Sequence, residues 1–184
     1  MNTTDLTKYT KAGYTPGRGF VIRALWYCAN YMVFMSPFPF CNGVKRLLIR
    51  MFGAKVGKGV VIKPRVNIKY PWLLSVGDNS WIGEEVWIDN LAQVSVGKNC
   101  CLSQRVLIET GSHDYSKSDF RLRVAPVTID DGVWICAGAV LTAGAVCRSH
   151  SVLAAGSVAN GELLPYSVYK GNPAEKVRER LIDD

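Results

Sequence analysis

The chain has 184 residues, of which 48% are hydrophobic and 20% are charged, and this length is enough for one domain with a sizeable core. Its 22 lysines and arginines outnumber its 15 aspartates and glutamates, which gives a formal net charge of +7 and favours anionic partners. The basic residues are scattered and no nucleic-acid recognition module is visible, so cofactor phosphates or an anionic membrane surface explain the charge without a nucleic-acid partner.

The first 20 residues are polar and lack the basic start and apolar run of a secretory signal, which predicts a cytoplasmic location. Residues 20–40 are apolar and aromatic, but Arg23 and Asn30 interrupt the run and two prolines end it. The apolar length is therefore too short for a comfortable membrane span. A second short helix, NGVKRLLIRMFG, is expected to lead into the domain that follows.

Two interpretations of residues 20–40 remain open. In the first, a helix covers the open end of the following domain, where strand edges need a cap. In the second, the helix lies on the inner membrane as a peripheral anchor. The second interpretation requires five basic side chains to face lipid phosphates: Arg18, Arg23, Lys45, Arg46 and Arg50.

A six-residue period begins at Val56 and continues through most of the chain. Each hexad opens with an aliphatic residue, apart from Cys147, and carries a small residue or valine at its fifth place. Such a period is typical of a parallel β-helix in which three hexads close one triangular coil and both places point inward. The fifth-place residues are Val60, Val66, Ser80, Val86, Ala92, Cys100, Val106, Ser112, Val133, Ala139, Ala145, Ser151 and Ser157.

The spacing between coils supports this architecture. Val56, Val76 and Val96 are 20 residues apart, which is one 18-residue coil with two residues inserted at a corner, and Ile129 to Cys147 is an uninterrupted 18. The period fails between Ile108 and Ile129. A solenoid accommodates an insertion by extruding it from a corner, and such loops often carry binding chemistry.

The six cysteines are expected to be free. Cys100 and Cys147 occupy inward repeat places, and Cys101 and Cys136 lie in neighbouring strand positions without the spacing of metal ligands. Buried thiols packed as small hydrophobic side chains explain this placement, and no metal site is expected.

At the other end of the chain, Asn172 and Pro173 resemble a helix start, because asparagine caps helices and proline suits the first turn. The tail AEKVRERLIDD is therefore predicted to form a short helix that closes the last coil. The domain organisation expected from these elements is an N-terminal helical cap over residues 1–51, a β-helix over 52–166 with an extruded loop at about 109–127, and a C-terminal segment with a helix over 167–184.

His113 is the leading candidate for catalysis. It is one of only two histidines, it stands where the period breaks, and Asp114 follows it. His150 falls at an outward place of an ordinary hexad and is expected to be solvated. A lone histidine is more often structural than catalytic. The position of His113 at the root of the loop is what favours a catalytic role.

Several segments together resemble the hexapeptide-repeat acyltransferases, and more narrowly the exopolysaccharide (colanic-acid type) acetyltransferases and the maltose and galactoside acetyltransferases. The resemblance covers nearly the whole chain and rests on the hexads and on LLIRMFGAKVGKGVVI, GSHDYSKSDF, VWICAGAVLTAGA and VYKGNPAEKVRER. It implies an all-β fold, the left-handed parallel β-helix, and a homotrimer with active sites between subunits. It also implies acetyl-CoA as donor and a hydroxyl of a sugar or polysaccharide precursor as acceptor.

The resemblance also assigns residues. His113 matches the general base, which takes the acceptor proton while that oxygen attacks the thioester in a ternary complex, without an acyl-enzyme. The backbone N–H of Ala137 matches the oxyanion donor, and Trp134 would flank the acceptor. Asp89, Asn90 and Asp114 are further acceptor-site candidates, although capping of a corner explains Asp89 and Asn90 nearly as well. The expected cofactor-binding residues are Ala137, Ala155, Gly156, Asn160, Gly161, Asn172, Pro173 and Arg178.

The chain departs from the family pattern near its C-terminus. Related sugar acetyltransferases carry a lysine where this chain has Gly161 and an arginine where it has Glu175. Lys170 or Lys176 are the available substitutes, so the contacts to the phosphates of coenzyme A are left open.

The sequence also bears on functions other than an O-acetyltransferase. A γ-type carbonic anhydrase needs three zinc-binding histidines, which two unrelated histidines do not supply. A sugar nucleotidyltransferase needs a glycine-rich nucleotide-binding domain, which does not precede the repeats. An antibiotic acetyltransferase, a cysteine-based ping-pong enzyme and a non-catalytic solenoid that serves as a scaffold remain as alternatives.

Overall fold

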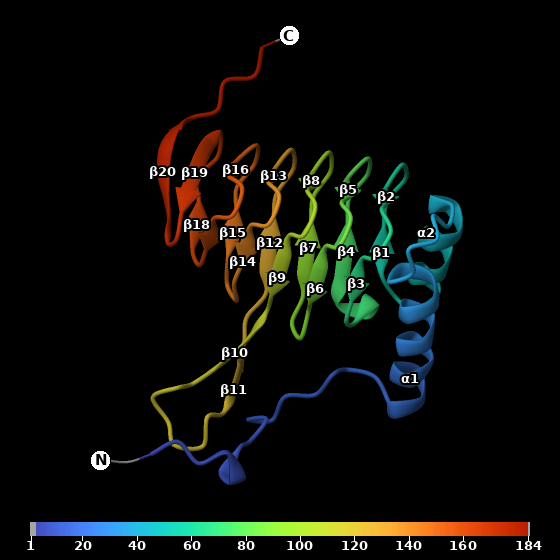
Figure 1. Ribbon diagram of the computed structural model, residues 1–184, viewed down its shortest axis with the longest axis vertical. Coiled ribbons are helices and arrows are strands. Elements are labelled where there is room, and N and C mark those ends of the chain that lie inside the picture. The colour runs from blue at the N-terminus through green and yellow to red at the C-terminus, as the bar shows by residue number, and fades with distance from the viewer. Residues whose placement is uncertain (1–2, 184) are drawn as a thin grey trace.

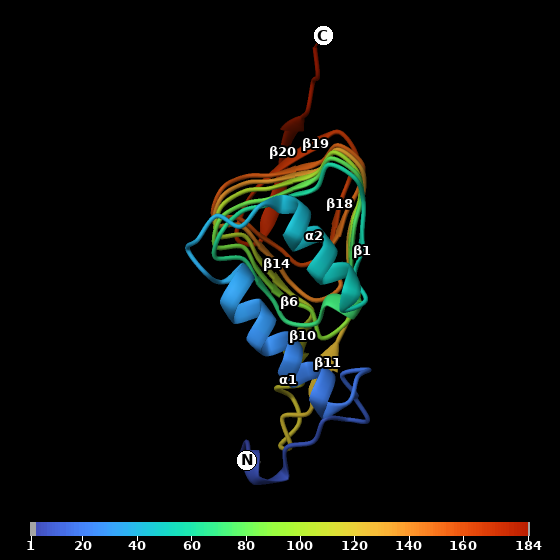
Figure 2. The ribbon, with the colours of Figure 1, turned by 90° about the vertical axis from the view of Figure 1, so that its right-hand side faces the viewer.

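A computed structural model describes residues 3–183 and confirms the predicted parallel β-helix. The chain winds through about six coils with a roughly triangular outline, and each side of the triangle is one parallel sheet (Figures 1 and 2). Equivalent strands pair coil to coil in parallel: Val56, for example, lies opposite Val76, which lies opposite Val96. The 20-residue spacing read from the sequence is therefore the length of one coil.

Three sheets form the faces of the β-helix, and each is defined by its strands. Sheet A contains β1 (Lys55–Val56), β4 (Leu74–Val76), β7 (Val94–Val96), β12 (Val127–Ile129), β15 (Val146–Cys147) and β18 (Glu162–Leu163). Sheet B contains β2 (Val61–Ile62), β5 (Trp81–Ile82), β8 (Cys101–Leu102), β13 (Trp134–Ile135), β16 (Val152–Leu153), β19 (Ser167–Gly171) and β20 (Ala174–Glu179). Sheet C contains β3 (Asn67–Ile68), β6 (Trp87–Asp89), β9 (Leu107–Glu109), β14 (Val140–Leu141) and β17 (Val158–Ala159).

The core is a column of side chains from the first and fifth places of the hexads. First-place residues such as Ile82, Ile108 and Ile135 are buried, and so are the fifth-place residues Val86 and Ala139. Two fifth-place residues depart from the pattern: Ala92 is half-buried and Ser112 is exposed. Ser112 departs because the chain has already left the coil there, so the last hexad counted before the break is not a coil segment.

Two helical segments cover the first coil, as the capping interpretation predicts. They are α1 (Phe20–Ala29), which continues as the π-helical turn η2 (Asn30–Phe34), and α2 (Asn42–Met51). Figure 2 shows α2 lying across the open end of the triangle. Trp26 and Phe34 are buried against the core. Short 3₁₀ turns, η1 (Leu6–Lys8) and η3 (Pro71–Leu73), complete the helical elements.

The cap hydrogen-bonds to the strand edge that the first coil leaves unpaired. Trp26 Nε1 donates to the carbonyl oxygen of Ile68 at 2.8 Å, and Asn42 Oδ1 accepts from the N–H of Ile62 at 2.8 Å. These bonds replace those that a preceding coil would make, because unpaired backbone groups at a buried edge are costly.

Three of the basic residues assigned to lipid contact donate hydrogen bonds to backbone carbonyls at this same strand edge. Lys45 is fully buried and its Nζ donates to the carbonyl oxygens of Ile62 and Lys63. Arg46 donates to the carbonyl of Val60, and Arg50 donates to those of Val56 and Gly57. The prediction that Lys45 faces lipid phosphates is therefore wrong, because its ammonium group is buried against backbone carbonyls, whereas Arg46 is half-buried and Arg50 remains exposed. Among residues 3–183, no helix is both long and apolar enough to cross a membrane.

The predicted C-terminal helix is a strand. β20 pairs antiparallel with β19, and the chain reverses at Gly171, which has a φ of +108°. A helix this short is marginal by itself, whereas pairing with β19 satisfies backbone groups at the edge of the last coil. The asparagine and proline that resemble a helix start form the turn between the two strands.

The break in the period produces an antiparallel hairpin, β10 (Gly111–His113) and β11 (Leu122–Val124), at the corner between sheets C and A. Figure 1 shows the hairpin projecting from the coil beside the N-terminal segment. Backbone bonds join the two: the N–H of Asp5 donates to Ser118 and the N–H of Leu122 donates to Thr10. The N-terminal segment therefore supports the extruded loop.

Candidate functional site

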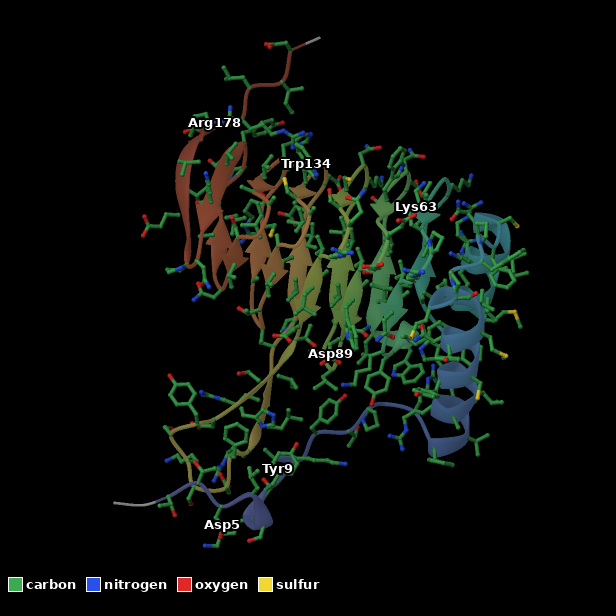
Figure 3. The ribbon with its side chains drawn as sticks, in the orientation of Figure 1. Asp5, Tyr9, Lys63, Asp89, Trp134 and Arg178 are labelled. Atoms are coloured by element: carbon green, nitrogen blue, oxygen red, sulfur yellow. The ribbon has the colours of Figure 1, made fainter. Side chains whose placement is uncertain are left out.

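A groove with a volume of about 720 Å³ lies where the hairpin, the N-terminal segment and the corner between sheets C and A meet. His113 lines it from the hairpin, and Asp89 and Glu109 line it from corners of successive coils. The N-terminal segment closes the other side with Tyr9 and Tyr14. Figure 3 shows Tyr9 and Asp89 on this side of the molecule. The remaining lining residues are Lys11, Lys69, Tyr70, Leu91, Gly111, Ser112, Tyr115, Phe120 and Leu122.

Contacts within the hairpin fix the ring of His113. Its Nδ1 atom lies 3.0 Å from the carbonyl oxygen of Phe120, and its ring stacks on the Phe120 ring at a centroid distance of 4.3 Å with an interplanar angle of 7°. Because a carbonyl oxygen only accepts, Nδ1 must carry the proton in the neutral ring. Nε2 is left as the lone-pair nitrogen, which is the atom that a general base needs.

Asp89 stands at the floor of the groove, where it pairs with Lys69 at 2.6 Å. Tyr14 lies close enough for charge to act on it, and burial, together with Tyr70 and Asp89, raises the pKa of its phenol to about 12. The hydroxyl of Tyr14 is buried and makes no hydrogen bond among the described residues. It is therefore a protonated hydroxyl enclosed in the wall of the groove.

Asn90, which the resemblance placed at the acceptor site, is instead a structural residue. It is fully buried, its Nδ2 donates to the carbonyls of Tyr70 and Leu73, and its Oδ1 accepts from the N–H of Tyr70. Every polar atom of the side chain is used to hold the corner insertion. No atom remains for an acceptor within this chain.

Asp114, a second acceptor-site candidate, bonds within the hairpin turn. Its carboxylate accepts from the backbone N–H and the hydroxyl of Ser116, and the hydroxyl bond lowers its pKa below the ordinary value. The side chain shapes the turn of the hairpin and does not line the groove. Of the acceptor candidates, only Asp89 lies with His113.

Ala137 lies at a different corner, between sheets B and C. The next residue in the chain occupies the turn position of this corner, with φ between 58° and 68° in each coil. That position carries Arg65, Glu85 and Arg105 in the earlier coils and Gly138 and Gly156 in the later ones. Added Cβ atoms at Gly138 and Gly156 would meet nothing within 4 Å. The later coils therefore present an open, nearly bare wall along this corner, and Ala155 is exposed on it.

Among the described residues, backbone hydrogen bonding leaves two donors available at this wall, the N–H groups of Ala137 and Ala155. The N–H groups of Cys136, Gly138 and Ala139 donate to carbonyls within the β-helix, and the carbonyl of Ala137 accepts from Gly156. Within residues 3–183, the N–H of Ala137 has no such partner. This is the property expected of an oxyanion donor.

The other C-terminal candidates lie around the last coil. Asn160 and Gly161 are exposed beyond β17, and Asn172 and Pro173 are exposed in the turn between β19 and β20. Arg178 is exposed on β20 opposite Val168. Of the substitutes for the missing basic residues, Lys176 is paired with Glu179 at 2.6 Å, whereas Lys170 is exposed without an ion pair among the described residues.

Trp134 lies on sheet B with its indole Nε1 donating to the Ser103 hydroxyl at 2.9 Å, and its side chain is 44% exposed. It does not line the His113 groove. Figure 3 places Trp134 and Arg178 on the side of the coil opposite Asp89 and Tyr9. One chain therefore brings His113 together with Asp89, but it does not bring His113 to Ala137 or Trp134.

The groove residues of the N-terminal segment were missed by sequence reasoning. Tyr9, Lys11 and Tyr14 belong to a polar stretch without periodicity, and no local signal points to the hairpin. Lys69 and Tyr70 stand at the corner insertion, where the 20-residue spacing was a usable signal.

The described residues contain no group of three or more histidines, cysteines or acids arranged to hold a metal ion. All six cysteines are free, and burial raises the pKa of the Cys147 thiol to about 12. A thiol with that pKa is a poor nucleophile at neutral pH.

Comparison with known proteins adds independent findings. The Escherichia coli (strain K12) protein WcaF, which carries the name of a colanic acid biosynthesis acetyltransferase, is 32% identical over 169 residues, covering 92% of each chain. A galactoside acetyltransferase solved with coenzyme A has a TM-score of 0.80 and 23% identity, covering 96% of this chain and 92% of its own. A Vibrio cholerae hexapeptide-repeat acetyltransferase complexed with acetyl coenzyme A also has a TM-score of 0.80, with 21% identity and 88% of each chain covered. No protein-family profile matches the chain.

Proposed function

The chain belongs to the hexapeptide-repeat acetyltransferases, and on that premise we propose that it transfers the acetyl group of acetyl-CoA to a hydroxyl of a sugar in an exopolysaccharide or lipopolysaccharide precursor. The observation that carries the proposal is the groove around His113, in which a histidine with a fixed tautomer faces an acidic corner. The full-length similarity to WcaF supports the sugar-precursor class of acceptor.

His113 acts as the general base in this proposal. Its Nε2 takes the proton of the acceptor hydroxyl as that oxygen attacks the thioester carbonyl, which gives a tetrahedral intermediate. Collapse of the intermediate breaks the carbon–sulfur bond and releases coenzyme A, whose thiolate regains a proton from His113. Holding both substrates together makes an acyl-enzyme unnecessary. Burial raises the pKa of Cys147 to about 12, so this thiol does not replace the histidine as the reactive group.

Asp89 and Tyr14 position the acceptor. The carboxylate of Asp89 can accept from a sugar hydroxyl, and the ring of Tyr14 forms part of the groove wall beside it. The raised pKa keeps that phenol protonated over the whole range in which a histidine base operates.

The corner between sheets B and C fits acetyl-CoA, which supplies the activated acetyl group. The bare wall at Ala137, Gly138, Ala155 and Gly156 leaves room for a long thin arm, since side chains beyond a methyl are missing there. The free N–H of Ala137 would donate to the oxyanion. Lys170 and Arg178, both exposed after the wall in the chain, are the candidate cations for the phosphates of coenzyme A.

The active enzyme is a homotrimer in this proposal. His113 and Ala137 lie at different corners of one β-helix, so a single chain does not hold both halves of the site. Three β-helices packed around a threefold axis would set the hairpin of one subunit beside the Ala137 wall of its neighbour.

The decisive experiment is a thiol-release assay with acetyl-CoA and a panel of sugars, combined with detection of the acetylated product. We expect saturable release of coenzyme A that depends on the acceptor and a rate law for a ternary complex. Failure to bind acetyl-CoA, together with no turnover on any sugar, would contradict the proposed function.

Peripheral contact with the inner membrane is a separate proposal, and it now rests on α1 alone. Phe20, Val21 and Leu25 are exposed on this helix, and the nearby Arg18 is the cation that remains on its surface. The full-length protein should float with anionic vesicles, and Val21→Glu with Leu25→Glu should abolish flotation. Equal behaviour of the two proteins would remove the membrane contact.

A further inference from the structure

A second cavity, with a volume of about 460 Å³, lies between α1 and the outer face of sheet C. Its walls include the aromatic rings of Tyr27 and Tyr31 from the helical cap and Trp87 from β6. All three side chains are more than half exposed, so their faces are open to a ligand. The volume falls within the range of about 300–1,000 Å³ that is usual for small-molecule sites.

This cavity adjoins the His113 groove. Lys69, Tyr70 and Asp89 line both spaces, so the ion pair between Lys69 and Asp89 forms a ridge between them. A ligand that presents a hydroxyl to His113 and extends over this ridge enters the second cavity. The two spaces can therefore hold adjoining parts of one molecule.

The cavity also contains polar groups, and one of them lacks a partner. The Nε of Arg23 is buried and makes no hydrogen bond among the described residues. Arg23 and Asp89 give the cavity a cationic and an anionic wall group beside its aromatic rings. A sugar ring satisfies both kinds of wall, because its C–H faces pack on aromatic rings while its hydroxyls accept from guanidinium and donate to carboxylate.

We propose that this cavity is a subsite for a second sugar unit, so that the acceptor is an oligosaccharide or glycoconjugate with at least two sugars and not a free monosaccharide. The inference rests on the proposed function only in taking the His113 groove as the place of the acetylated sugar. The subsite itself is a binding site that operates with or without transfer.

The test compares methyl β-galactoside, a galactose–glucose disaccharide, a glucose–glucose disaccharide and an octyl galactoside as acceptors. The wild type should show a kcat/KM about tenfold higher for at least one disaccharide than for the monosaccharide, as expected for one additional aromatic contact. Trp87→Ala should remove that advantage and leave the monosaccharide value unchanged. Trp81→Ala is the matched control, since Trp81 is similarly exposed but lies on sheet B outside the cavity.

Binding measured by isothermal titration calorimetry without acetyl-CoA separates this inference from the proposed function. Disaccharide binding that Trp87→Ala weakens supports the subsite even if no acetyl group is transferred. Equal kcat/KM for monosaccharide and disaccharide, unchanged by Trp87→Ala, would overturn the subsite and leave the transferase intact. Absence of binding by both disaccharides, or a preference for the octyl chain over the second sugar, would also overturn it.

Discussion

The Nδ1 atom of His113 lies 3.0 Å from the carbonyl oxygen of Phe120, and this contact makes Nε2 the basic nitrogen of the ring. We therefore expect His113→Ala to lower kcat by about 10²–10⁴, because the acceptor hydroxyl loses its base. The KM for acetyl-CoA should change little, since the cofactor wall lies at another corner. Steady-state kinetics with acetyl-CoA and the best acceptor measure both quantities.

His150 supplies the control for that variant. Its ring stacks on Tyr166 at 4.7 Å and its Nδ1 lies 2.8 Å from the Ser149 hydroxyl, at the corner between sheets A and B. His150→Gln should keep most of the activity. If both histidine variants retain full kcat, the assignment of the base is wrong.

Subunit complementation tests whether each active site is shared. His113→Ala removes the base and Ala155→Trp blocks the bare wall, so each variant alone should be inactive. If neighbouring subunits supply the two halves, the doubly purified mixed trimers should recover about a third of the wild-type activity, because one of the three interfaces in each mixed trimer joins an intact hairpin to an intact wall. Co-expression with two affinity tags and assay of the doubly purified trimer measure this recovery. Mixed trimers without activity would place both halves in one chain.

Lys45 provides a test of the N-terminal cap. Its buried Nζ donates to two carbonyl oxygens, at 3.0 Å to Ile62 and 3.1 Å to Lys63, and burial lowers its pKa below the ordinary value. Lys45→Met keeps the apolar stem but leaves both carbonyls unsatisfied, so we expect the free energy of unfolding to fall by about 2–4 kcal/mol. Lys58→Met, at an exposed position, should stay within about 0.5 kcal/mol of the wild type. Urea denaturation compares the two.

The β-helix was predictable because every coil repeats one local geometry, so the hexad rule that buries Ile82 also buries Ile108 and Ile135. Lys45 was misassigned because its charge is visible in the sequence, whereas the carbonyls it meets belong to a strand that follows 17 residues later. The C-terminal strand was missed for a similar reason. Local capping residues favoured a helix, while the partner strand that decides the outcome is a tertiary feature.

Some residues of the candidate site could be predicted from the sequence and others could not. His113 could be found because the period fails around it, and the wall at Ala137 could be found from its motif. The groove around His113 is completed by Tyr9 and Tyr14, which are brought to it by backbone pairing between two segments about 110 residues apart, such as Thr10 with Leu122. No pattern within the N-terminal segment encodes that contact.

The raised pKa of Tyr14 predicts that the free energy of unfolding falls at alkaline pH. Burial and its neighbours raise its pKa from 10.0 to about 12 in the folded protein. Between these values the unfolded chain loses the phenolic proton while the folded chain keeps it, so the free energy of unfolding falls as pH rises through this window. Below about pH 10 both states are protonated and the phenol contributes no pH dependence.

Tyr14→Phe should therefore flatten the stability profile between about pH 10 and 12, whereas Tyr115→Phe, at a highly exposed position, should not. Denaturation at stepped pH values gives both profiles. Identical alkaline limbs in the wild type and Tyr14→Phe would contradict the placement of this phenol.

Thiol labelling distinguishes direct transfer from a cysteine-based ping-pong route. Cys28 and Cys41 are exposed, whereas Cys147 is buried and its pKa is raised to about 12 by burial, and further by Asp130 and Cys100. Iodoacetamide at about pH 8 should label the two exposed cysteines quickly and reach Cys147 only after unfolding, because the thiolate is the reactive form. Mass spectrometry of digests identifies the labelled sites. The doubly labelled protein should retain its activity, since neither cysteine lies near His113 or Ala137; loss of activity with trapping of an acetylated cysteine would replace the histidine mechanism with a covalent one.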